Sequence, residues 1–106
     1  DLEQVKIWLK KLKQENINLP VNLGLAGPTK LQTLIKYALI CGVGPSISVI
    51  RKRAKDLTKL LVPFEPTEII EQINQKSFLE EYENIDSLHF FPLGGIEASA
   101  SFATKF

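Results

Sequence analysis

The feature that most constrains the fold is a pattern that occurs twice: an apolar run, then Pro and Gly residues, then the start of a helix. One run, Ser87–Leu93, leads into Gly94-Gly95 and a helical pattern, and the other, Leu19–Ala26, leads into Gly27-Pro28-Thr29. Proline favours the first turn of a helix, and glycine allows close backbone approach after a strand. Two such junctions predict βα units, and therefore a parallel sheet.

The predicted strands cover about residues 19–26 and 86–93, and four to five helices surround them. Helical spacing of apolar residues marks the segments 2–15, 29–41, 46–61, 66–82 and 96–106. The second strand is rich in Leu and Phe, which predicts burial on both of its faces. Two strands cannot close a sheet, and both chain ends look cut, so we expect residues 1–106 to be a single piece of a larger body.

Composition excludes several classes of protein. The chain is 44% hydrophobic and 24% charged, which is ordinary for a globular domain. A single cysteine, Cys41, excludes an intramolecular disulfide and a cysteine zinc site. No apolar run reaches the roughly 18 residues of a membrane span, and no signal-peptide core is present. We therefore expect a cytoplasmic protein that does not associate with membranes.

Positive charge is concentrated in the first part of the chain. Residues 1–60 hold eleven Lys or Arg against four Asp or Glu, whereas residues 61–106 hold two against eight. The segment 31–61 resembles a helix-turn-helix whose basic second helix, 46–61, would meet DNA phosphates through Arg51, Lys52, Arg53 and Lys55. A small helical module that binds nucleic acid or protein is thus the alternative function, although solvated helix faces produce the same asymmetry.

The residues alone identify a ligand-binding corner but no reaction. Gly94-Gly95 after a strand is a possible phosphate site, although glycine pairs also form plain turns. His89 is the single histidine, and a lone strand histidine is more often a hydrogen-bonded core residue than a catalytic group or a ligand. No Walker loop, nucleophile elbow or metal-ligand pair is present, so no catalytic residue and no metal site is assigned.

Two segments resemble the methylenetetrahydrofolate reductase family. Leu88-His89-Phe90-Phe91-Pro92-Leu93 is similar to the last barrel strand of that family, which reads Leu-His-Phe-Tyr-Thr-Leu followed by Asn-Arg. The segment from Leu19 to Gly42 is similar to the seventh strand and following helices of its short bacterial members. The resemblance covers the whole chain in order, from the sixth helix through the seventh strand, an insertion of helices and the eighth strand to the eighth helix.

The resemblance implies that the chain is the C-terminal portion of a TIM (β/α)8 barrel, a fold of roughly 250 residues. The family binds FAD and uses NADH or NADPH to reduce 5,10-methylenetetrahydrofolate to 5-methyltetrahydrofolate, a step of one-carbon metabolism and methionine biosynthesis. Its main flavin-phosphate and acid residues lie on earlier strands, so the fragment alone is expected to be inactive. The implied partners are the folate substrate, the remainder of the barrel and further copies in a homo-oligomer.

The resemblance also implies the site residues. Carried over by position, Phe91 and Leu93 lie at the mouth of the barrel near the flavin or the stacked substrate, and Gly94 and Gly95 complete that cofactor loop. Gly27 and Pro28 occupy the loop that meets the folate or nicotinamide. Here Gly95 stands where the family has Arg, and the loop 26–29 lacks an aromatic residue that several members carry. A third possibility is an oligomerising fragment that pairs its open strands with those of another copy.

Overall fold

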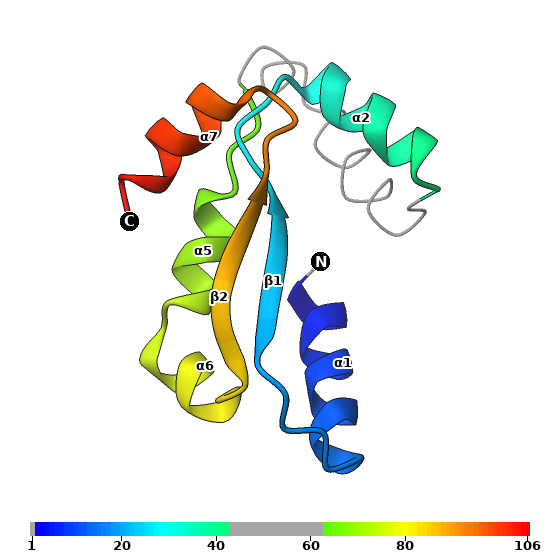
Figure 1. Ribbon diagram of the computed structural model, residues 1–106, viewed down its shortest axis with the longest axis vertical. Helices are drawn as coiled ribbons and strands as arrows, with labels where there is room; N and C mark the ends of the chain where they lie inside the picture. Colours follow the sequence, from blue (N-terminus) through cyan, green and yellow to red (C-terminus); the bar gives the residue numbers. More distant parts are fainter. Residues whose placement is uncertain (1, 43–62) are drawn as a thin grey trace. The chain divides into compact units, whose positions relative to one another are not determined.

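The computed structural model describes residues 2–42 and 63–106, and shows a mixed α/β chain (Figure 1). The described elements, in chain order, are α1 (Leu2–Gln14), β1 (Val21–Ala26), α2 (Leu31–Ile40), α5 (Thr67–Ile73), α6 (Lys76–Glu81), β2 (Ile85–Phe91) and α7 (Ile96–Ala103). The predicted mixture of two strands with four to five helices is confirmed. The proposed basic helix at 46–61 lies outside the described residues.

The two strands are adjacent and parallel, as the two junctions predicted (Figure 1). The Val21 amide donates to the Asn84 carbonyl oxygen at 2.7 Å, and the Gly27 amide donates to the Phe91 carbonyl oxygen at 2.9 Å. The strands are shorter than predicted at one end each. β1 begins after Pro20, and β2 ends before Pro92, because proline has no N–H to contribute to a ladder.

β2 contains one residue more than the stretch of β1 that it pairs with. Between the two hydrogen bonds given above, β1 advances by six residues, from 21 to 27, and β2 by seven, from 84 to 91. Asp86 and Ser87 are both exposed between the half-buried Ile85 and Leu88. We assign the extra residue to this pair, as a β-bulge, because inside and outside otherwise alternate along a strand.

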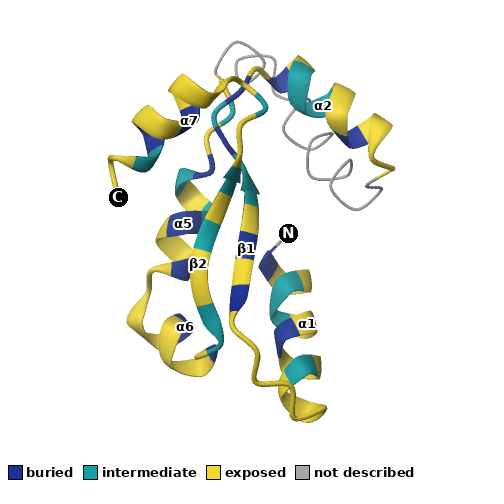
Figure 2. Ribbon diagram, in the orientation of Figure 1, coloured by how far each residue is buried: buried dark blue, intermediate teal, exposed yellow. Residues whose placement is uncertain are grey.

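The described residues fall into two compact units, and each strand passes from the first into the second. Unit 1 comprises residues 1–24 and 67–89. Its core joins side chains from α1, β1, α5, α6 and the turn before β2, and Figure 2 shows the inward positions in dark blue: Leu2, Leu9, Val21, Leu23, Ile73, Phe78 and Tyr82. Segments far apart in sequence therefore supply one apolar cluster, whose burial is the main stabilising contribution here.

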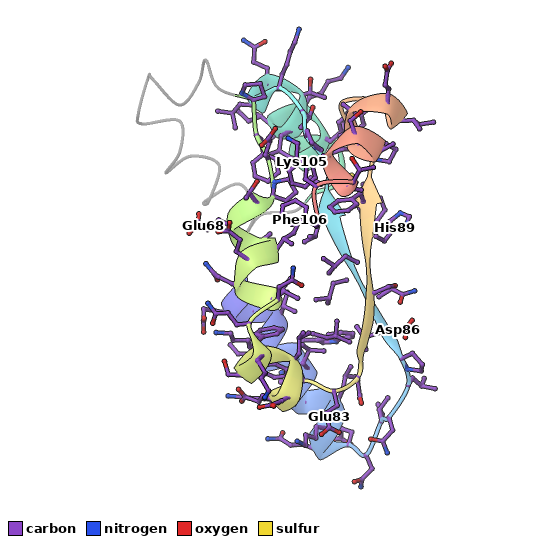
Figure 3. The ribbon with its side chains drawn as sticks, turned by 90° about the vertical axis from the view of Figure 1, so that its left-hand side faces the viewer. Glu68, Glu83, Asp86, His89, Lys105 and Phe106 are labelled. Carbon is purple, nitrogen blue, oxygen red and sulfur yellow. The ribbon has the colours of Figure 1, made fainter. Side chains whose placement is uncertain are left out.

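Unit 1 covers one face of its strand segments and leaves the other face exposed. Helices α1, α5 and α6 lie on one side of the strands, and Asp86 and His89 extend from the other side (Figure 3). Asn22, Ser87 and His89 are exposed, and Ser87 Oγ donates to Asn22 Oδ1 at 2.7 Å on that face. The prediction that the second strand is buried on both faces is therefore wrong for the described residues.

Unit 2 comprises residues 25–66 and 90–106, and holds α2, α7 and the carboxyl ends of both strands. Leu31 and Ala38 are buried on α2, with Leu34 and Ile35 packed beside them. On α7, Phe102 is buried, and its ring meets Phe90 of β2 edge-on at a centroid distance of 5.8 Å. No helix in the described ranges is long and apolar enough to cross a membrane.

Candidate functional site

The two strand-to-helix junctions meet within unit 2. The Phe91 carbonyl oxygen accepts from the Gly27 amide at 2.9 Å and from the Leu93 amide at 2.8 Å. The second bond closes a tight turn around Pro92, which ends β2 and redirects the chain towards α7. The carboxyl ends of the parallel strands therefore lie at one rim, which is where α/β proteins place their ligand sites.

The chain after β1 is fixed by a second short pairing. Thr29 and Phe64 form an isolated antiparallel bridge, in which the Thr29 amide donates to Phe64 O at 3.1 Å and the Phe64 amide donates to Thr29 O at 2.8 Å. Both backbone groups of Thr29 are thus satisfied. The bridge holds Pro28-Thr29-Lys30 in an extended path just before α2 begins, with Lys30 as the N-cap residue in an extended conformation.

Gly94 is required by packing. A Cβ atom built on Gly94 would collide with the Pro28 carbonyl oxygen and would lie 3.0 Å from Thr29 Cα. The backbone of the second junction therefore lies directly against that of the first, an approach that a side chain would prevent. Glycine is required at position 95 for a different reason. Gly95 is the N-cap residue of α7, and its φ of 104° and ψ of 152° fall in a region that is nearly restricted to glycine.

Gly27 makes a similar contact with α7. A Cβ atom on this buried glycine would collide with Ser99 Oγ and would lie 3.3 Å from Phe91 O. Ser99 is 6% exposed, and its hydroxyl has no hydrogen-bond partner in the described part of the chain. One closely packed corner is thus formed by the loop that follows β1, the end of β2 and the Ser99 side of α7.

A cavity of about 610 Å³ opens beside this corner. Residues of both junctions line it, together with the 63–65 segment and one face of α7: Pro28, Thr29, Lys30, Thr33, Pro63, Glu65, Leu93, Gly94, Ala98, Ser101, Phe102 and Lys105. Its volume lies within the range of small-molecule sites. Its charged lining residues are two lysines and one glutamate, and its apolar lining residues include Phe102 and Leu93.

The sequence-based site residues divide into two groups. Leu93, Gly94 and Pro28 line the cavity together, as two junctions at one rim require. Phe91, Gly27 and Gly95 do not line it. The Phe91 side chain is 52% exposed at the end of β2, Gly27 is buried against Ser99, and Gly95 borders open space.

Sequence reasoning missed several cavity residues. Thr29 and Lys30 line it from the loop before α2, Thr33 from the first turn of α2, Ser101 from α7 and Lys105 from the turn that follows α7; Lys105 is labelled in Figure 3. Ser101 and Lys105 are four residues apart and would share one face of the predicted helix 96–106, although the structure ends α7 at Ala103. The part played by Thr29 depends on its bridge to Phe64, for which the sequence carries no pattern.

Two further sequence features, the single cysteine and a possible metal site, are not part of this cavity. Cys41 is an exposed free cysteine at the end of α2. Within residues 2–42 and 63–106, no three His, Cys, Asp or Glu side chains gather as a metal site would need.

No protein-family model matches the chain.

Proposed function

We propose that the chain is the C-terminal part of an FAD-dependent, methylenetetrahydrofolate reductase-like barrel enzyme. Such an enzyme reduces 5,10-methylenetetrahydrofolate to 5-methyltetrahydrofolate with NADH or NADPH. The observation that supports it most is the shared cavity: Pro28 of the first junction and Leu93 and Gly94 of the second line one space at the ends of adjacent parallel strands. The resemblance assigns these two loops to one side of a flavin and folate site.

The exposed strand face in unit 1 supports the barrel part of the proposal. In a (β/α)8 barrel the helices cover the outside of the strands, and side chains from the other face fill the interior in layers. Among the described residues of unit 1, the helices lie on one side of the strands and His89 extends from the other side (Figure 3). Asn22 and Ser87 are also exposed, and they are hydrogen-bonded to each other. Under this proposal those residues belong to the barrel interior, and the remaining strands are the partner that covers them.

The residues present fit an aromatic ligand better than a phosphate at the glycine pair. Phe91 and Leu93 offer apolar surface for a flavin or folate ring, and Gly94 is exposed and lines the cavity, so its backbone permits close approach. The Gly95 amide already donates to the Pro92 carbonyl oxygen at 3.1 Å. We therefore assign Gly95 to shaping the loop, and Gly94 to the ligand contact.

A bound flavin would pass a hydride from the nicotinamide to the folate. The described residues would contribute binding and orientation: Phe91 and Leu93 by stacking and apolar contact, and Gly27 and Pro28 by holding the folate-side loop against β2. No residue of this chain is assigned a proton-transfer step.

The proposal is tested by comparing the 106-residue chain with the complete polypeptide that contains it. We expect the complete protein to be purified with bound FAD and to oxidise NADH or NADPH in the presence of the folate substrate. The chain alone should retain no flavin and oxidise no NADH, because most of the site lies elsewhere. Stoichiometric flavin on the chain alone, or none on the complete protein, would contradict the proposal.

Phe91→Ala in the complete protein tests the site. We expect kcat/KM for the folate to fall about tenfold, because losing one aromatic stacking contact costs about 1.5 kcal/mol. Phe106→Ala is a matched control, since Phe106 is 55% exposed and Phe91 is 52% exposed, both within unit 2. Equal losses in the two variants would refute a specific role for Phe91.

A further inference from the structure

We draw no further inference here: the strongest candidate, the outer face of α1 in unit 1, where Ile7 and Trp8 are 49% and 48% exposed beside the exposed Lys10 and Lys11, carries no proposal because nothing in the described part of the structure shows what covers it.

Discussion

Unit 1 and unit 2 are held together by different kinds of contact. In unit 1, seven buried apolar side chains from α1, β1, α5, α6 and the following turn form one cluster. In unit 2, the two junctions approach backbone to backbone at Gly94 and Pro28, and a cavity opens beside them. Both buried hydroxyls without a partner among the described residues, those of Thr29 and Ser99, belong to unit 2.

The difference indicates where binding is to be sought. Unit 1 satisfies the usual rules of packing, with apolar groups inside and its polar strand groups on the exposed face. Unit 2 leaves polar groups unpaired and uses glycine at positions where a side chain would clash or be strained. Such departures from a well-satisfied core are concentrated at functional sites.

The largest expected effect tests the apolar core of unit 1. Ile73 is 2% exposed, and Ile73→Ala should lower the free energy of unfolding by about 3 kcal/mol, through lost transfer energy and the cavity left behind. Ile7→Ala is the control, because Ile7 lies on α1 in the same unit and is 49% exposed; its cost should stay below about 1 kcal/mol. Urea unfolding measures both, and similar costs would contradict the described core.

A smaller effect is expected from the backbone contact in unit 2. Gly94→Ala should cost about 2 kcal/mol, because the new methyl group collides with the Pro28 carbonyl oxygen and the rigid backbone must shift. Gly42→Ala has no neighbour within 4 Å but requires a φ of +66°, so it should cost about 1 kcal/mol through backbone strain alone. If Gly94→Ala proved the milder change in urea unfolding, the two junctions would not be in contact.

The smallest effect is expected at a second close contact in unit 2, between Gly27 and Ser99, which a double-mutant cycle tests. Gly27→Ala should be destabilising because its methyl group meets Ser99 Oγ, whereas Ser99→Ala alone removes an unpaired hydroxyl and should change stability little. Combined with Ser99→Ala, Gly27→Ala should cost about 1 kcal/mol less than it costs alone. Strict additivity of the two changes would show that the loop and α7 are not packed as described.

The sequence predicted the order of elements and the meeting of the junctions. Proline and glycine after each apolar run indicated where strands end: the structure ends β1 at Ala26, as predicted, and ends β2 at Phe91, two residues before the predicted end. Parallel pairing followed from the helical connection between the runs, and placed Pro28, Leu93 and Gly94 at one rim. These features depend on local signals, which a single sequence carries.

Features that depend on strand register could not be predicted from the sequence. The extra residue at Asp86-Ser87 turns Leu88 and Phe90 towards the helices, and leaves His89 and Phe91 exposed. No residue type marks this bulge, and a one-residue slip reverses every later side chain in a strand. Trp8 of α1 is a comparable case: it is 48% exposed, whereas its neighbour Leu9 is buried in the described core.

The central claim is that two parallel strands bring both junctions to a common rim, and NMR distance contacts across the strands test it most directly. We expect contacts between Gly27 and the Phe91–Pro92 peptide, slow exchange of the Gly27 amide, and no close Hα–Hα pairs between β1 and β2. Strong Hα–Hα contacts, which close antiparallel pairs produce, would contradict the account and remove the basis for a shared site.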